Sequence, residues 1–197
     1  MSLFSSLEFR YAVHQLADMP PDHGAEVAFA GRSNAGKSTV INAVANRRKL
    51  AFVSKTPGRT QALNFFDMGQ ECALVDLPGY GYASVPREEQ ARWGELISTY
   101  ISTRNALILL VLVVDARHGL TALDKQMLTW LAPTHKAVLV LLTKSDKLNR
   151  QQATAMLRQT ETEIARHPGE TAVQLFSGTA KTGVRQAQAV IARYLKK

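Results

Sequence analysis

The chain has 197 residues, of which 46% are hydrophobic and 20% charged, and these shares exclude a largely disordered or collagen-like protein. Its single cysteine excludes an intramolecular disulfide framework and a cysteine-based zinc site. The formal net charge is +8. Residues 27–66 hold seven basic and no acidic residues, and residues 136–197 hold eleven basic and four acidic ones. These blocks favour a polyanionic partner through phosphate neutralisation, with a purely solubilising role as the alternative.

The pattern of apolar residues predicts alternating strands and helices. An apolar run over residues 26–30 predicts a strand, and a helix follows over residues 37–46. Two short apolar runs, residues 62–67 and 72–76, are separated by the turn sequence MGQE and predict a β-hairpin. Beyond residue 85 we expect helices over residues 86–102, 122–131, 150–166 and 184–195, and strands over residues 106–115, 136–143 and 172–177.

Continuous Val/Leu strands are typical of a parallel sheet that is covered on both faces. We therefore expect an α/β, three-layer fold: a mostly parallel six-stranded sheet with one antiparallel edge strand and helices on both faces. Residues 1–25 are expected to form an N-terminal extension that packs on a domain of residues 26–197.

The first chemical motif lies between the first predicted strand and helix. It reads Gly31-Arg32-Ser33-Asn34-Ala35-Gly36-Lys37-Ser38 and fits the phosphate-loop pattern G-x-x-x-x-G-K-[ST]. Its glycines let backbone N–H groups face phosphate oxygens, and the helix N-terminus adds its positive dipole end. Lys37 is expected to reach the β- and γ-phosphates, and the Ser38 hydroxyl to bind Mg²⁺. All eight residues are predicted to bind a nucleotide.

The second motif is Asp76-Leu77-Pro78-Gly79, at the end of a predicted strand. An Asp at that position, beside a phosphate loop, can hold Mg²⁺, and the Gly79 N–H can face a γ-phosphate. These four residues are therefore predicted to line the phosphate site.

The third motif is Thr143-Lys144-Ser145-Asp146, also at a strand end. The Asp146 carboxylate can accept two hydrogen bonds from guanine, from N1–H and the 2-amino group. Adenine offers neither donor in that arrangement, so the motif predicts selection of GTP over ATP. The Lys144 stem can lie along the plane of the base. Taken alone, Ser145 or Asp146 also suits a solvated helix N-cap.

In this order, the motifs GRSNAGKS, TPGRTQ, DLPGYG, TKSD and FSGTAKTG are similar to those of translation-factor-class P-loop GTPases. The wording of TPGRTQ and DLPGYG resembles the EngB/YihA (YsxC) family of ribosome-biogenesis GTP-binding proteins. The resemblance implies that Thr60 joins Ser38 and Asp76 on Mg²⁺, and that the backbone at Ser177 and Gly178 contacts the guanine O6. It also implies a nucleotide-lining segment formed by Gly58, Arg59, Thr60, Gln61 and Ala62.

The resemblance further implies a catalytic set of Lys37, Thr60, Gly79 and Asn34. Tyr80 stands where related enzymes place a water-orienting glutamine, so we expect slow intrinsic hydrolysis, with Tyr80 packed or directed away from the phosphate. Asn34 matches a position that binds K⁺ in potassium-activated relatives. Tolerance of a left-handed loop conformation is the alternative reason for an Asn there.

These implications describe a cytoplasmic, Mg²⁺-dependent GTPase that binds GTP and GDP and works as a switch. Its GTP form, with residues 47–62 and 77–85 ordered, would bind the assembling large ribosomal subunit and its rRNA, and its loss would disturb cell division and septation. We expect a monomer without stable membrane association. The alternatives are another P-loop NTPase, such as a small-molecule kinase, or a GTPase that acts on tRNA or at the membrane.

Overall fold

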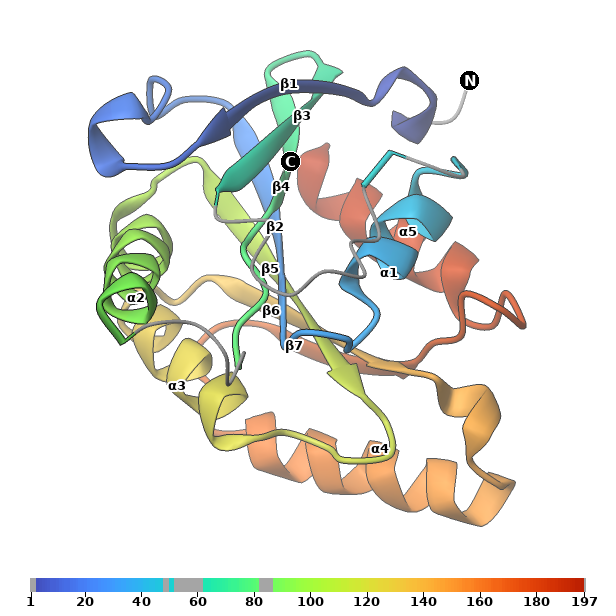
Figure 1. Cartoon of the computed structure of the whole chain (residues 1–197). Helices are drawn as coiled ribbons and strands as arrows, with labels where there is room; N and C mark the ends of the chain where they lie inside the picture. Colours follow the sequence, from blue (N-terminus) through green and yellow to red (C-terminus); the bar gives the residue numbers. More distant parts are fainter. Residues whose placement is uncertain (1–2, 48–49, 52–61, 82–86, 197) are drawn as a thin grey trace.

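In the computed structural model, the described residues (3–47, 50–51, 62–81 and 87–196) form one sheet with helices on both faces (Figure 1). The strand order is β1-β3-β4-β2-β5-β6-β7. The strands are β1 (Glu8–Val13), β2 (Ala25–Gly31), β3 (Leu63–Gly69), β4 (Cys72–Asp76), β5 (Leu107–Asp115), β6 (Ala137–Thr143) and β7 (Thr171–Leu175). The predicted α/β, three-layer fold is confirmed.

The five α-helices of the described part of the chain begin and end close to the predicted positions. They are α1 (Lys37–Val44), α2 (Arg87–Thr103), α3 (Ala122–Leu131), α4 (Arg150–Ile164) and α5 (Val184–Leu195). Among these residues, no helix is both long enough and apolar enough to cross a bilayer.

The sheet has seven strands, where the sequence predicted six, because Glu8–Val13 adds β1 beside β3. The β1 sequence EFRYAV alternates polar and apolar residues over residues 8–11, the pattern of a half-exposed edge strand, and lacks the continuous apolar run on which the predicted strands were based. The predicted hairpin is present as β3 and β4, which pair antiparallel. β1 pairs antiparallel with β3 in turn, so the antiparallel side of the sheet lies where it was expected, with one more strand outside it.

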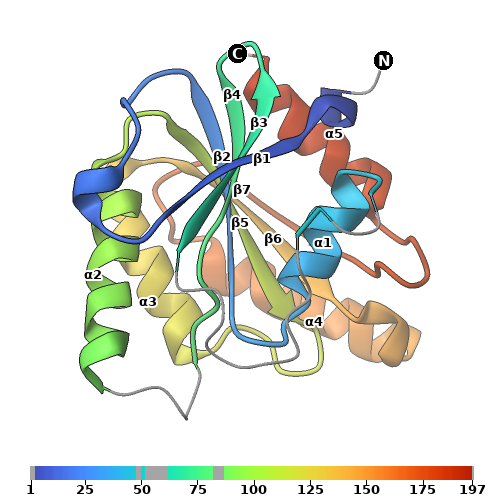
Figure 2. The same cartoon turned by 45° about the horizontal axis from the view of Figure 1, so that its top comes forward.

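Alternate residues of the central strands pack into two separate cores, one on each face of the sheet. On one face, Val27 and Phe29 of β2 pack with residues of α1 and α5. On the other face, Ala28 and Ala30 pack with residues of α2, α3 and α4. Figures 1 and 2 show α1 and α5 on one side of the sheet, and α2 and α3 on the other. Because both faces are covered, these strands are apolar at successive positions.

A buried ion pair ties the start of β2 to the residue that follows α2. The Arg104 Nη2 atom lies 2.5 Å from Oε1 of Glu26, and the Tyr100 hydroxyl donates to Oε2 of the same carboxylate at 2.9 Å. Arg104 also donates to the carbonyls of Pro20, at 2.7 Å, and Pro21, at 3.0 Å. The pair therefore anchors the chain at the start of β2. The phosphate loop follows the opposite end of the same strand.

Candidate nucleotide-binding site

The phosphate-loop motif, residues 31–38, connects β2 to α1. Gly36 caps α1 with φ +100°, and Asn34 has φ +63°, so both lie in the left-handed region. The turn places Lys37 and Ser38 in the first turn of α1, at the carboxyl end of a central strand. Helix N-termini attract anions through free N–H groups and the helix dipole, so this turn suits a phosphate group. The left-handed Asn34 backbone agrees with the alternative explanation for this residue, that an Asn tolerates such a loop conformation.

Lys37 and Asp76 come from different motifs and meet as a buried ion pair between Nζ and Oδ1. Their side chains are only 10% and 8% exposed. Asp76 reaches this position because β4 pairs parallel with β2, which places it beside Phe29. Since Ser38 follows Lys37 on α1, two of the three predicted magnesium ligands lie close to the lysine.

The third predicted magnesium ligand, Thr60, lies outside the described residues. The same is true of three other predicted lining residues: Gly58, Arg59 and Gln61. Ala62, the last of that group, is buried directly before β3.

Residues 76–79 run beside the phosphate loop. The Tyr80 N–H donates to the Gly31 carbonyl at 3.4 Å, and the Tyr80 carbonyl accepts from the Ser33 N–H at 2.8 Å. Leu77 and Pro78, in the middle of this motif, are buried, and Gly79 is half-buried. The backbone bonds of Tyr80 therefore hold the Gly79 peptide close to the phosphate loop.

The Tyr80 side chain turns toward α3. Its hydroxyl donates to Oδ1 of Asp124 at 2.5 Å, which confirms that the phenol is packed. Burial, together with the neighbouring Asp124 carboxylate, raises the pKa of Tyr80 well above its usual value. The phenol is therefore a neutral donor and offers no amide group for orienting water.

The motif of residues 143–146, predicted to recognise the base and called the base-recognition motif below, is bonded directly to the phosphate loop. The Thr143 hydroxyl lies 2.5 Å from the Ala35 carbonyl and 3.0 Å from the Val114 carbonyl. The Lys144 Nζ donates to the Asn34 carbonyl at 2.7 Å. The position of one motif therefore fixes that of the other.

The last two predicted site residues, Ser177 and Gly178, follow β7 and lie against the same motif. The Ser177 hydroxyl donates to Oδ1 of Asp146 at 2.6 Å, and the Ser145 hydroxyl donates to the Phe176 carbonyl at 3.0 Å. The bond from Ser177 lowers the pKa of the Asp146 carboxyl, which is thus ionised at neutral pH and can only accept hydrogen bonds. That is the acceptor that guanine N1–H and its 2-amino group require.

These motifs together enclose a cavity of about 230 Å³. Its lining includes six residues that the sequence predicted: Gly36, Thr143, Lys144, Asp146, Ser177 and Gly178. It also includes Thr39 of α1, which sequence reasoning missed although it directly follows the phosphate-loop motif. A Cβ atom added at Gly178 would lie 2.5 Å from Cγ2 of Thr39, so the threonine methyl group occupies the space beside the glycine.

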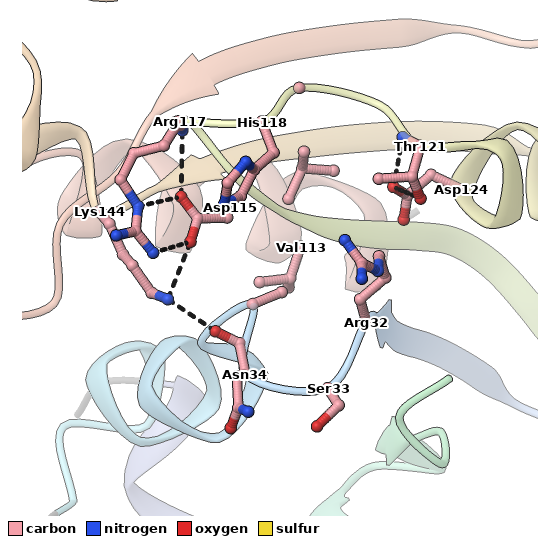
Figure 3. Close-up of a pocket in the computed structure, with 13 residues that line it drawn as sticks. Arg32, Ser33, Asn34, Val113, Asp115, Arg117, His118, Thr121, Asp124 and Lys144 are labelled. Carbon is pink, nitrogen blue, oxygen red and sulfur yellow. Dashed lines mark hydrogen bonds and ion pairs between the residues drawn. The ribbon is translucent and has the colours of Figure 1, made fainter. Parts of the chain in front are cut away.

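A second cavity, of about 190 Å³, lies between the phosphate loop and the segment after β5 (Figure 3). Asp115 and Arg117 line it together with Lys144 and Asn34. Neither Asp115 nor Arg117 was predicted as a site residue, because the sequence DARHG matches no nucleotide motif. The available signal was an Asp at the end of an apolar strand, the same signal that identified Asp76.

Comparisons with known proteins agree with this geometry. A family model described as 50S ribosome-binding GTPase matches residues 26–144. The probable GTP-binding protein EngB of Azoarcus sp. (strain BH72) is 52% identical over 196 residues, which cover 99% of this chain and 94% of the relative. Its counterpart in Methylobacillus flagellatus is 51% identical over 195 residues, with the same two coverages.

Solved structures share the fold. A crystal structure of a probable GTP-binding protein EngB has a TM-score of 0.67 at 24% identity, covering 87% of this chain and 99% of that one. Era in complex with MgGDPNP and nucleotides 1506–1542 of 16S ribosomal RNA has a TM-score of 0.65 at 21% identity, covering 87% and 57%.

Proposed function

The chain belongs to the EngB family of GTP-binding proteins, which are P-loop GTPases, and from this premise we propose that it is a switch in the assembly of the large ribosomal subunit. In this proposal the GTP form binds the assembling particle, and hydrolysis releases it. The protein acts in the cytoplasm as a monomer without stable membrane association, and its loss disturbs cell division and septation.

The observation that carries the proposal is the cavity of about 230 Å³ in which three motifs meet. We assign the guanine base to this cavity, with the Asp146 carboxylate on N1–H and the 2-amino group and the backbone at Gly178 on O6. The phosphates then extend toward residues 31–38 and the N-terminus of α1, where we propose that Lys37 exchanges its contact with Asp76 for one with a phosphate. A small-molecule kinase has no use for an ionised carboxylate held by Ser177 in the base site, so the GTPase is favoured over that alternative.

The residues at the end of the phosphate loop fit a magnesium ion. Mg²⁺ prefers oxygen ligands and is held by few protein groups together with phosphates, and Ser38, Asp76 and Thr60 supply hydroxyl and carboxylate oxygens. When bound, the ion neutralises charge on the β- and γ-phosphates. We propose that Lys37, which pairs with Asp76 in this structure, adds a second positive charge there when the phosphates are bound, and that the Gly79 N–H donates to the γ-phosphate.

Hydrolysis is proposed to be slow without a partner. The Tyr80 hydroxyl is bonded to Asp124, so the usual glutamine position supplies no group that orients water. We propose that K⁺ beside the Asn34 amide supplies positive charge to the transition state instead.

The ribosomal partner is supported by charge and by the family. Residues 27–66 and 136–197 each carry a net charge of +7, as seven minus zero and eleven minus four, and rRNA is a polyanion. The matching family model is described as a 50S ribosome-binding GTPase. The crystal structure of Era, which shares the fold, contains a segment of 16S ribosomal RNA. The role in division and septation is supported by the sequence resemblance, and the cytoplasmic location by Cys72, a free buried thiol.

We further propose that residues 1–25 pack as an extension on the domain of residues 26–197. Phe4 and Leu7 are buried in the core that α1 and α5 cover, and β1 extends the sheet beside β3. Both observations support an extension held by the same core as the rest of the chain.

The proposal is tested by sedimenting cell extract with GDP or with a nonhydrolysable GTP analogue at several salt concentrations. We expect the wild-type protein to migrate with large-subunit particles only with the GTP analogue, and to dissociate as salt rises. Asp146→Asn is the matched control, because it changes the base site and leaves the basic residues in place. Migration that ignores the nucleotide, or that Asp146→Asn retains with the GTP analogue, contradicts the switch. Phosphate transfer from GTP to a small acceptor would favour a kinase.

A further inference from the structure

Asp115, at the end of β5, is the centre of a hydrogen-bond network beside the phosphate loop (Figure 3). Its Oδ1 accepts from the Arg117 backbone N–H at 3.0 Å and from Arg117 Nε at 2.9 Å. Its Oδ2 accepts from Arg117 Nη2 at 2.6 Å, and the Lys144 Nζ lies 2.9 Å from the same oxygen. The Asp115 side chain is 11% exposed and that of Arg117 46%, so a buried carboxylate is held from the surface by a guanidinium fork.

Lys144 carries this network to the phosphate loop through its 2.7 Å bond to the Asn34 carbonyl. Lys144 has φ +56° and Asn34 has φ +63°, values that residues other than glycine rarely adopt. Such conformations persist where the surrounding contacts determine them. One ammonium group therefore joins two left-handed loops, and Asp115 determines where that group lies.

We propose that Asp115 and Arg117 form a positioning pair for Lys144, which holds the base-recognition motif against the phosphate loop and thereby slows release of the guanine nucleotide. The inference rests on the proposed nucleotide site. Neither residue is placed in contact with the nucleotide, and both act through Lys144.

Charge and geometry give each member of the pair a distinct task. Burial alone raises the pKa of Asp115, but the hydrogen bonds from Arg117 and Lys144 outweigh it and hold that pKa well below its usual range. The carboxylate is therefore ionised; Arg117 bonds both of its oxygens, and Lys144 shares Oδ2 with Arg117. Arg117 can fix the carboxylate plane because a guanidinium donates two parallel bonds, which an ammonium group cannot reproduce.

The pair sits where the sheet register brings the two motifs together. Asp115 is the last residue of β5 and lies opposite Thr143, the last residue of β6. Lys144 directly follows Thr143, so this register brings its ammonium group within reach of the Asp115 carboxylate. The alternative role is purely structural, as a brace for the end of β5. The two roles differ because a brace alters stability, whereas a positioning pair alters nucleotide release through Lys144.

The test measures dissociation of a fluorescent GDP analogue, chased with unlabelled GDP, from wild type and from Arg117→Ala, Arg117→Lys and Asp115→Asn. We expect Arg117→Ala to speed dissociation by about tenfold, the effect of losing a hydrogen bond to a charged group. Arg117→Lys is expected to recover little of that loss. Arg193→Ala is the control for loss of a surface arginine, because the Arg193 side chain is 55% exposed, close to the 46% of Arg117, and forms an ion pair with Glu170 away from the site. It should stay within about twofold of wild type.

A double variant separates positioning from bracing. If Arg117 acts through Lys144, Arg117→Ala adds no further acceleration when Lys144→Ala is already present. Additive effects, an Arg117→Ala rate within twofold of wild type, or a similar acceleration in Arg193→Ala would overturn the pairing. Melting of each nucleotide-free variant shows whether it is folded. If wild-type protein binds no GDP, the proposed function itself fails, and that result is distinct from wild-type binding with an unaffected Arg117→Ala.

Discussion

The Tyr80 hydroxyl donates to Oδ1 of Asp124 at 2.5 Å, while the other oxygen of that carboxylate accepts from both the N–H and the hydroxyl of Thr121. Asp124 is 2% exposed and closes the capping box at the start of α3. The Tyr80 backbone is bonded to the phosphate loop at Ser33. One residue thus links the phosphate loop to the N-terminus of a helix on the face opposite α1.

Replacing Tyr80 by Phe removes the donor and leaves one oxygen of the buried Asp124 carboxylate without it. We expect a loss of about 1–3 kcal/mol in the free energy of unfolding, the range for an unsatisfied buried polar group. Denaturant unfolding measures it. Tyr11→Phe is the control, since Tyr11 is half-buried and its hydroxyl has no hydrogen-bond partner within the part of the chain that the structure describes. Equal stability of Tyr80→Phe and Tyr11→Phe would contradict a role for the bond.

The contact between Thr39 and Gly178 predicts a paired dependence in the base site. Gly178→Ala places its methyl group against Cγ2 of Thr39, and this overpacking should weaken GDP binding by at least about fivefold. Thr39→Ser removes only the opposing methyl group. The double variant should therefore return to within about twofold of wild-type affinity by calorimetry. A Gly178→Ala protein that binds GDP normally, or one that Thr39→Ser does not rescue, contradicts this packing.

The Asp115 network predicts a pH dependence of stability. The folded-state pKa of Asp115 is depressed, so its contribution is fully present above the unfolded value near 4 and is lost as the pH falls. Asp115→Asn removes this titration. The difference in unfolding free energy between wild type and Asp115→Asn should thus shrink from about pH 5 to pH 3. A difference that stays constant over that range would be inconsistent with a depressed pKa.

The Asn34 amide is proposed to help bind K⁺, and its backbone conformation offers a clean control. Asn34→Gly keeps the left-handed backbone at φ +63° and removes the amide. We expect wild-type GTP hydrolysis to be about tenfold or more faster in K⁺ than in Na⁺, and Asn34→Gly to be equally slow in both. Equal wild-type rates in the two salts would end the potassium proposal and leave the loop conformation as the reason for Asn34.

The architecture followed from the sequence because the strong signals were local. Buried Val/Leu strands, helical spacing and motifs at strand ends together placed the phosphate loop, Asp76 and Asp146 at one end of the sheet. β1 was missed because Glu8–Val13 begins with alternating polar and apolar residues, whereas the predicted strands were identified by continuous apolar runs. Its assignment depends on pairing with β3, a contact that the sequence of β1 does not encode on its own.

The missed site residues share a different cause. Arg117 and Asp115 matter through the register of β5 on β6, which sets Asp115 opposite Thr143. Thr39 matters through its packing on Gly178, which is distant in the sequence and arrives from the loop after β7. Both contacts arise from the tertiary fold. The nucleotide motifs, in contrast, can be recognised from residue types and spacing in the sequence alone.

The central claim is that the cavity around Asp146 selects guanine, and calorimetry with Mg²⁺ present tests it most directly. Wild-type protein should bind GDP at least about a hundredfold more tightly than ADP, because adenine offers the ionised carboxylate neither of the two donors that guanine presents. Asp146→Asn should lose GDP affinity and gain affinity for xanthosine diphosphate, whose 2-oxo group accepts from the new amide while Ser177 keeps an acceptor. Equal binding of GDP and ADP by wild type, or no change of base preference in Asp146→Asn, would contradict the account.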